Sequence, residues 1–314
     1  MLKAIEHCIG IGRLLRAVVR DRPLAVHFQW LLIPTLERFA IRRLRRHVPV
    51  VVTVHDVEPF NGKRVARAQR AGYDRALAAA DKLIVHTAAG RDTLEERGLA
   101  RERIAVIPHG LLATGRDRLR RQIDGNARWT IVQFGKIQHY KGVDLLVEAL
   151  GRLGPAERDA IRVIVAGEPL IDVTPLTARA ATLGLSPATF DLRPGYLAAD
   201  AVEALLTEAD AFVFPYRMIE ASGAFMLVAA AGKWIVASRL GAFVDLIGDD
   251  GETGELFHPN DVDALAAALT RSVGRRPTRS SAAMVPTWTE IGRMTADVYR
   301  EAASRWRAGR PATC

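Results

Sequence analysis

Short apolar runs alternate with longer stretches of helical spacing along almost the whole chain. Residues 49–56 (PVVVTVHD) and 82–87 (KLIVHT) are brief and rich in β-branched side chains, so they predict buried strands. Between such runs, residues 35–47 and 65–80 repeat apolar side chains at helical spacing. Regular alternation of strands and helices is typical of an α/β protein with parallel sheets.

The pattern runs twice through the chain. The first series predicts strands at residues 24–30, 49–56, 82–87 and 103–110, and the second predicts strands at 129–135, 161–168, 189–196 (running into a loop), 211–216 and 234–241. A polar, arginine-rich linker (111–129) separates them, and a final helix is expected near 289–309. We therefore predict two Rossmann-like, doubly wound domains, residues 1–118 and 119–314, with a ligand crevice between them at the carboxyl ends of the strands.

The first twenty residues have the spacing of an amphipathic, basic helix. Glu6, His7, Arg13 and Arg16 interrupt any apolar core of a signal peptide, and no stretch approaches the roughly 18 apolar residues of a membrane span. The prediction is a cytoplasmic protein. The helix either docks on its own domain or contacts a membrane surface.

Composition narrows the class of protein. The 314 residues are 49% hydrophobic and 25% charged, which excludes a disordered or low-complexity chain. Cys8 and Cys314 alone form neither a disulfide framework nor a zinc site. The net charge of +9 is concentrated near the N-terminus, because residues 1–120 hold 23 Lys and Arg against 12 Asp and Glu. This third of the chain favours an anionic partner, either a nucleic acid or a membrane surface.

Residues 135–142 (GKIQHYKG) form the strongest chemical motif, because they follow a predicted strand and open a helix. Such a turn exposes backbone N–H groups at the positive end of a helix, where Lys136 and Lys141 can bracket a diphosphate. The alternative is two solvated lysines flanking a turn. The spacing differs from GxxxxGK[ST], which excludes a P-loop.

A second turn of this kind lies about eighty residues later, where Phe214-Pro215-Tyr216 precedes Glu220 and a helix of small residues beginning near Ser222 and Gly223. Its helix N-terminus also suits an anion, and Glu220 is placed to accept hydrogen bonds from sugar hydroxyls. The alternative for Glu220 is an ordinary acid at a helix N-terminus.

Taken in order, these segments resemble the GT-B glycosyltransferases, specifically glycosyltransferase family 4 (group 1) and its relatives. The resemblance rests on segments 24–30, 49–56, 80–94, 104–110, 134–150, 163–168, 194–216, 222–238 and 250–269. It implies two Rossmann-like domains that face a cleft. It also implies a retaining, metal-independent transfer of a sugar from a nucleotide-sugar donor to a glycan or lipid-linked acceptor, in bacterial polysaccharide or glycoconjugate synthesis.

The resemblance also assigns roles to residues. His55 would point at the transferred sugar, Lys136 and Lys141 would hold the diphosphate, and Gly195 and Tyr196 would lie beside the base. The catalytic residues implied are His55, Lys136, Lys141 and Glu220. The nucleotide-sugar-binding residues implied are Gly135, Lys136, Lys141, Gly195, Tyr196, Glu220, Ser222 and Gly223.

The chain departs from the family pattern twice. The second glutamate of the family's pair would fall near Leu227 or Val228, so the chain looks like relatives with a Ser-Gly loop, and its ribose recognition must differ. The first domain also opens with a helix, and Gly10 and Gly12 do not follow a strand, which suggests a missing first βα unit. Both departures motivate an alternative, a non-catalytic nucleotide-sugar-binding subunit.

The basic region has its own candidate partner. Arginines alternate with apolar side chains between residues 36 and 46, a combination suited to anionic lipid or a lipid-diphosphate acceptor, with a solvated helix face as the alternative. Nucleic-acid binding is disfavoured because no aromatic platform accompanies the charge. No metal is expected, since residues 56–58 and 261–263 more simply end a strand and cap a helix. The membrane or acceptor residues predicted are Arg38, Arg42, Arg43, Arg45 and Arg46.

Overall fold

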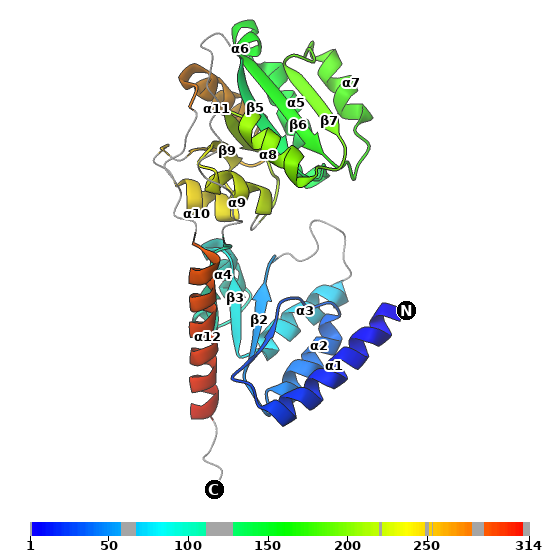
Figure 1. The fold of residues 1–314 in the computed structure, drawn as a ribbon, viewed down its shortest axis with the longest axis vertical. Coiled ribbons are helices and arrows are strands. Elements are labelled where there is room, and N and C mark those ends of the chain that lie inside the picture. The colour runs from blue at the N-terminus through cyan, green and yellow to red at the C-terminus, as the bar shows by residue number, and fades with distance from the viewer. Residues whose placement is uncertain are drawn as a thin grey trace. The chain divides into compact units, whose positions relative to one another are not determined.

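The computed structural model describes residues 2–57, 67–110, 128–219, 222–248, 251–252, 254–277 and 286–309. The chain divides into two compact units (Figure 1). The first consists of Met1–Pro108 together with Thr287–Cys314, and the second consists of His109–Pro286. Among the described residues, no helix combines the length and the apolar character needed to cross a membrane.

The first unit is built on a four-stranded parallel sheet in the order β1-β2-β3-β4. Its strands are β1 (Val26–Phe28), β2 (Val50–Val54), β3 (Lys82–Val85) and β4 (Ile104–Val106). Its helices are α1 (Leu2–Asp21), α2 (Pro34–Leu44), α3 (Arg67–Ala79), α4 (Ala88–Glu96), the 3-10 turn Arg101–Arg103 and α12 (Trp288–Ala308).

Strand β2 shows how both faces of this sheet are covered. Its five residues are all buried, and successive side chains point to opposite faces. Val50, Val52 and Val54 belong to the cluster that includes residues of α1 to α4, whereas Val51 packs with Ile84 and with Val298 and Ala302 of α12. Helix α12 therefore closes the second face of the sheet.

The position of α12 differs from the domain prediction, which placed residues 119–314 together. The helix follows the second series of strands in the sequence, yet it belongs to the first unit. Its apolar residues pack on a sheet face that the crossover helices α2, α3 and α4 leave uncovered, because these helices share the other face. Removal of this apolar sheet face from water explains why the chain returns to the first unit after it has formed the second.

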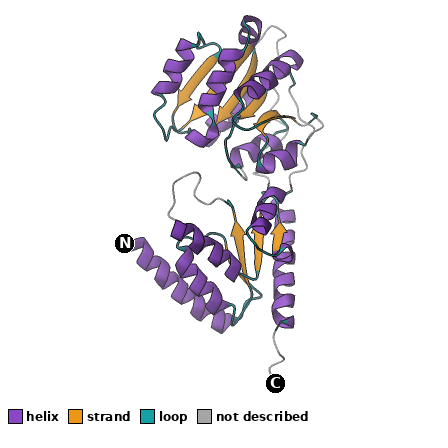
Figure 2. Cartoon of the chain, turned by 180° about the vertical axis from the view of Figure 1, so that it is seen from behind, coloured by secondary structure: helices purple, strands orange, loops and turns teal. Residues whose placement is uncertain are grey.

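The second unit contains a six-stranded parallel sheet in the order β10-β9-β8-β5-β6-β7, with helices on both faces (Figure 2). The strands are β5 (Trp129–Phe134), β6 (Ile161–Gly167), β7 (Phe190–Pro194), β8 (Ala211–Phe214), β9 (Trp234–Ser238) and β10 (Gly254–Phe257). The helices are α5 (Val143–Arg152), α6 (Pro155–Ala160), α7 (Thr174–Thr182), α8 (Ala199–Glu208), α9 (Gly223–Ala230), α10 (Gly241–Ile247) and α11 (Val262–Arg275), with a 3-10 turn at His139–Lys141.

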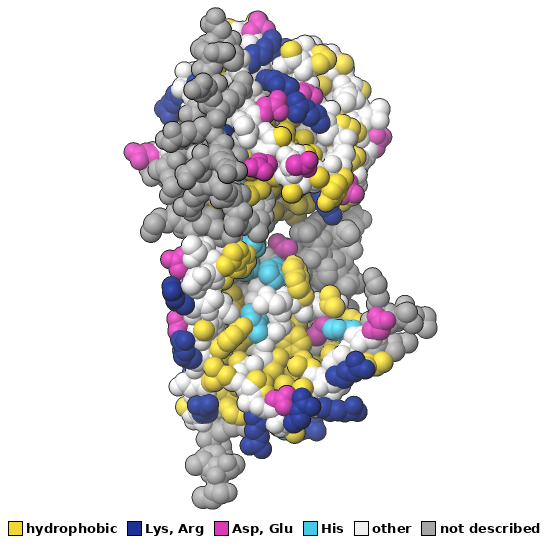
Figure 3. Space-filling view, in the orientation of Figure 1, with side chains coloured by type: hydrophobic (Ala, Val, Ile, Leu, Met, Phe, Trp, Pro, Cys, Tyr) yellow, Lys and Arg dark blue, Asp and Glu magenta, His cyan; other side chains and the backbone are white. Residues whose placement is uncertain are grey.

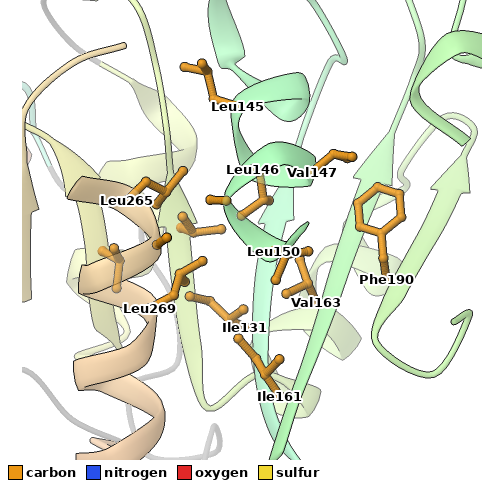
Figure 4. Close-up of a cluster of buried hydrophobic side chains, with 14 of the residues drawn as sticks. Ile131, Leu145, Leu146, Val147, Leu150, Ile161, Val163, Phe190, Leu265 and Leu269 are labelled. Carbon is orange, nitrogen blue, oxygen red and sulfur yellow. The ribbon is translucent and has the colours of Figure 1, made fainter. Parts of the chain in front are cut away.

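Two apolar layers hold this second sheet. On one face, side chains of α5 and α11 converge on Ile131 of β5 and Val163 of β6 (Figure 4). On the other face, Phe212 and Phe214 of β8 pack with residues of α8, α9 and α10. Full burial of each large apolar side chain contributes about 1.5–3 kcal/mol, so these layers fix the strands whose ends carry the candidate site.

The predicted α/β fold with two parallel sheets is confirmed, and all nine predicted strands are present. Asp261 caps α11 as expected, because its side chain accepts a hydrogen bond from Ala264 N at 2.8 Å. The sequence analysis missed β10, α6 and α10, and the two helices, of six and seven residues, are too short to show a helical period. The described strands of the first sheet lie side by side in the order in which they occur in the sequence. In the second sheet, this order reverses between β5 and β8.

Candidate functional site

The reversal of strand order in the second unit lies between the neighbouring strands β5 and β8. In open α/β sheets, the connections that leave two such strands diverge, and ligands bind outside the carboxyl ends of the strands at that point. The connection after β5 carries residues 135–142, and the connection after β8 runs from Pro215 toward α9. Both motifs predicted from the sequence therefore meet at the switch point of the sheet.

Glycines allow the backbone of these connections to approach closely. Gly142 has φ of +66°, and a Cβ on it would lie 1.9 Å from the carbonyl oxygen of Pro215. Gly135 has φ of +104°, and a Cβ on the neighbouring Gly167 would lie 1.9 Å from the Gly135 oxygen. Only glycine fits at Gly142 and Gly167, so the sequence imposes the tight packing of the switch point.

Lys141 is the buried cation of this site. Its residue is 8% exposed, and its Nζ lies 5.1 Å from the centroid of the Tyr216 ring. Nζ also lies over Gly135, where an added Cβ would stand 3.1 Å from it. Burial lowers the pKa of Lys141 below its ordinary value. A desolvated ammonium group of this kind is stabilised when an anion binds beside it.

Hydrogen bonds position the turn that carries Lys141. The buried Gln133 donates from Nε2 to the carbonyl oxygen of Lys141 at 2.8 Å. Arg217, from the connection after β8, donates to His139 O at 2.8 Å and forms two 2.8 Å hydrogen bonds with the Asp144 carboxylate. The backbone N–H of Arg217 donates to Tyr140 O at 2.7 Å. Arg217 thus joins the two connections, a role that the sequence analysis did not predict.

The N-terminus of α9 lies on the second connection. Ser222 is buried and caps this helix, because its side chain accepts a hydrogen bond from Phe225 N at 3.4 Å, whereas Gly223 is exposed. The first N–H groups of α9 are consistent with the predicted anion-binding role. The predicted residue Glu220 lies outside the described residues.

Of the remaining predicted residues of the second unit, Lys136 and Tyr196 are exposed and Gly195 is half-buried. Lys136 lies in the turn after β5, one residue beyond Gly135. Gly195, with φ of +154°, follows β7 and donates a backbone hydrogen bond to Gly167 O at 2.9 Å. Tyr196 is 83% exposed beside it. The structure thus places Gly195 and Tyr196 at the same carboxyl edge of the sheet as Lys141, on the side of β7.

In the first unit, polar and aromatic side chains gather at the carboxyl ends of the strands, and histidines are visible on its face (Figure 3). His55 follows β2, and its ring stacks on Trp30 with centroids 4.1 Å apart and planes 15° apart. His86 follows β3, and its Nε2 lies 3.1 Å from His55 Nδ1. The sequence analysis predicted His55 but neither Trp30 nor His86.

A third histidine of the first unit, His27, has a structural role. His27 hydrogen-bonds through Nδ1 with Tyr299 Oη and through Nε2 with Thr53 Oγ1, each at 2.7 Å. Burial lowers the pKa of His27 to about 4, so the ring is neutral near pH 7. Asp56 directly follows His55 in the sequence, and burial raises the pKa of its carboxyl group to about 6. His27 links β1, β2 and α12 in one network.

Comparison with protein families decides the assignment. Residues 5–111 match the family described as Glycosyltransferase Family 4, and residues 128–274 match the family described as Glycosyl transferases group 1. The chain belongs to the family 4, group 1 glycosyltransferases. Its two parallel Rossmann-like units are those of the GT-B fold.

Two curated proteins are similar to this chain. It is 30% identical over 237 residues to MMP alpha-(1->4)-mannosyltransferase of Mycolicibacterium hassiacum, a match that covers 71% of this chain and 54% of the relative. It is 31% identical over 154 residues to the lipopolysaccharide core biosynthesis mannosyltransferase LpsB of Rhizobium meliloti, covering 48% and 42%. The chain thus spans about half the length of the curated relatives it matches.

Among solved structures, the chain resembles Anabaena HepE in complex with UDP-glucose. The TM-score is 0.68 at 17% identity, and the match covers 95% of this chain and 82% of HepE. At this level of identity the likeness concerns the fold.

The predicted arginines of this glycosyltransferase have different surroundings. Arg45 donates to Asp81 at 2.9 Å and to Ala79 O at 3.0 Å, so it joins α2 to the end of α3. Arg38 is half-buried, with its Nε out of solvent contact. Arg42, Arg43, Arg45 and Arg46 are exposed, but Arg45 is held by Asp81. On α2 itself, the predicted contact with an anionic surface therefore depends on Arg42 and Arg43.

Among the residues that the structure describes, no three His, Cys, Asp or Glu side chains are grouped closely enough to hold a metal ion. The metal-independent reaction stays a prediction.

Proposed function

We propose that this glycosyltransferase transfers a sugar from a nucleotide-sugar donor to a glycan or lipid-linked acceptor, with retention of anomeric configuration and without a metal. The observation that carries the proposal is the buried Lys141 ammonium at the switch point, 8% exposed and facing the Tyr216 ring. Such a site favours a ligand that brings negative charge, and the donor's diphosphate does so. The named mannosyltransferase relatives support glycosyl transfer as the reaction.

In this mechanism the second unit stabilises the leaving group. As the bond between the anomeric carbon and the diphosphate oxygen breaks, negative charge grows on the diphosphate. Lys141, Lys136 and the N–H groups at the start of α9 are groups that can stabilise it without rearrangement. The hydrogen bonds of Gln133 and Arg217 keep the turn around Lys141 in place during this step.

In a transfer that retains the anomeric configuration, the donor phosphate accepts the proton of the acceptor hydroxyl on the same face of the sugar. No strong base is therefore required on the opposite face. His55 then orients the sugar or the acceptor hydroxyl. Gly195 and Tyr196 are assigned to the base of the nucleotide, and Tyr196 offers an exposed ring for stacking. Ribose recognition relies on groups other than a carboxylate near Leu227 and Val228, where the chain has none.

The donor and the reaction are tested together. Thermal-shift screening against UDP-, GDP- and ADP-sugars identifies the donor, and transfer is then assayed with that donor on a glycan extract and on a lipid extract. The proposal expects product with one extract in the wild type and loss of both binding and product in Lys141→Ala. Donor binding without transfer to either extract would instead support the non-catalytic nucleotide-sugar-binding subunit.

The first unit is assigned a role on the acceptor side at an anionic membrane surface. On α2, Phe39 is 63% exposed, and the exposed Arg42 and Arg43 lie three and four residues further along the helix. Residues at this spacing share a helix face, and an apolar ring flanked by cations suits the headgroup region. A peripheral location at the inner face of the cytoplasmic membrane follows from this assignment.

Vesicle co-sedimentation tests the surface. We expect the wild type to sediment with vesicles containing anionic lipid but not with neutral vesicles, and we expect Phe39→Ser with Arg42→Gln and Arg43→Gln to stay in the supernatant. Arg271→Gln, an exposed arginine of the second unit paired with Glu255, is the matched control. Equal sedimentation with neutral and anionic vesicles, or none with either, contradicts this part of the proposal.

A further inference from the structure

His86 and His55 each follow a strand of the first sheet and lie next to each other at the carboxyl ends of β2 and β3. Val54 of β2 pairs with Val85 of β3, and Val85 pairs with Val106 of β4, so His55, His86 and Ile107 follow their strands at one level. The backbone around His86 is well held, because Ile107 N donates to Val85 O at 2.8 Å and Thr87 caps α4. A rigid strand end thus fixes where the His86 ring lies.

Both nitrogens of the His86 ring have defined neighbours. Nδ1 lies 2.9 Å from the carbonyl oxygen of Ile107, and Nε2 lies 3.1 Å from His55 Nδ1. A carbonyl oxygen only accepts hydrogen bonds, so Nδ1 of His86 must carry a proton. In a neutral ring the other nitrogen, Nε2, then has a lone pair and accepts a hydrogen bond.

This arrangement determines the tautomer of His55. Because Nε2 of the neutral His86 ring accepts, Nδ1 of His55 must donate, and the lone pair of a neutral His55 ring then lies on Nε2. This tautomer is the opposite of the one that an unconstrained histidine prefers in water. Trp30, stacked on the His55 ring at 4.1 Å, restrains the ring from swinging out of this orientation.

We propose that His86 is a positioning residue that holds His55 as the Nδ1–H tautomer and so fixes the protonation pattern and the orientation of the His55 ring. The inference rests on the proposed function for the role of His55. The tautomer itself is a property of the free protein, and it is measured without any substrate.

Long-range ¹H–¹⁵N spectra of the full chain test the tautomer. They are recorded near pH 8.5, well above the ordinary histidine pKa of about 6.5, and the His55 signals are identified by their loss in His55→Gln. We expect Nδ1–H in the wild type and in His86→Gln, whose amide can both accept from His55 and donate to Ile107. His86→Leu removes the acceptor and is expected to shift His55 toward Nε2–H. His258→Leu, in the second unit, is the matched control and leaves the His55 signals unchanged.

Kinetics then test the consequence. His86→Leu is expected to lower kcat on the order of 10- to 100-fold, as for a misplaced reacting group, with the donor KM little changed, and His86→Gln should recover most of it. The proposal would be overturned if His55 of the wild type carried its proton on Nε2, or if His86→Leu left the His55 spectrum unchanged. If a variant does not fold, the wild-type spectrum alone decides. Absence of transfer with every donor would contradict the proposed function while the spectra still decide the tautomer.

Discussion

Gly142 and the carbonyl oxygen of Pro215 are in direct contact, so close that a Cβ on Gly142 would lie 1.9 Å from that oxygen. The two residues are far apart in sequence, but β5 and β8 are neighbours in the sheet. The contact brings the turn that carries Lys141 against the connection that carries Tyr216 and Arg217. The distance between the turn of Lys141 and the connection of Tyr216 and Arg217 therefore depends on Gly142, which has no side chain.

Replacement of Gly142 by alanine is expected to destabilise the fold strongly. A residue with a Cβ pays about 1–2 kcal/mol for the left-handed conformation at φ of +66°, and the clash with Pro215 adds to it, so we expect a loss above about 2 kcal/mol. Urea titration measures the free energy of unfolding. In the control Gly274→Ala, on α11 with open space around it, the change is a gain of up to about 1 kcal/mol. Similar values for the two variants would contradict this view of the switch point.

Arg217→Met is expected to weaken donor binding about tenfold, because it releases His139 and Asp144 and lets the turn around Lys141 relax. The comparison is Arg179→Met, which also breaks a two-bonded ion pair, here with Glu148 between α7 and α5. Titration calorimetry with the donor found by thermal shift gives both affinities. If Arg179→Met weakens binding as much as Arg217→Met, the effect comes from general loss of ion pairs.

The neutral, buried His27 predicts a pH dependence of stability. Its pKa is about 4 in the folded chain and ordinarily about 6.5, so between these values the unfolded chain binds more protons. Stability from this residue is therefore present above pH 6.5 and is lost as the pH falls toward 4. His27→Gln removes the titration. The Tm of the wild type should fall more than that of the variant between pH 7 and pH 5, and parallel curves would show that His27 is not the cause.

Much of the second unit follows from its sequence because the informative residues are close together in it. Gly135, Lys141 and Gly142 fall in one turn between an apolar run and a helix, as predicted, and the strand order of the folded sheet places that turn at the switch point. Asp261 precedes the helix it caps, so its role too was predicted from neighbouring residues.

Other features depend on contacts between distant segments. Arg217 reaches Asp144, 73 positions away, and nothing in the residues around either one indicates the partner. His86 is next to His55 only because β2 and β3 pair in register. Helix α12 has an ordinary amphipathic pattern, which predicts that it packs on a sheet but not on which sheet. Strand pairing and the choice of sheet face are properties of the folded chain.

The role of Lys141 in holding a diphosphate can be measured by calorimetric titration of the wild type and Lys141→Met with UDP, GDP and ADP, and with the nucleoside that corresponds to the best ligand. Loss of one hydrogen bond to a charged group is worth about 1.5–3 kcal/mol, so we predict that Lys141→Met binds the preferred nucleoside diphosphate about 10- to 150-fold more weakly. Affinity for the nucleoside, which has no phosphate, should stay the same. Equal affinity of the two proteins for the nucleoside diphosphate, or an equal loss for nucleoside and nucleoside diphosphate, would contradict the site described above.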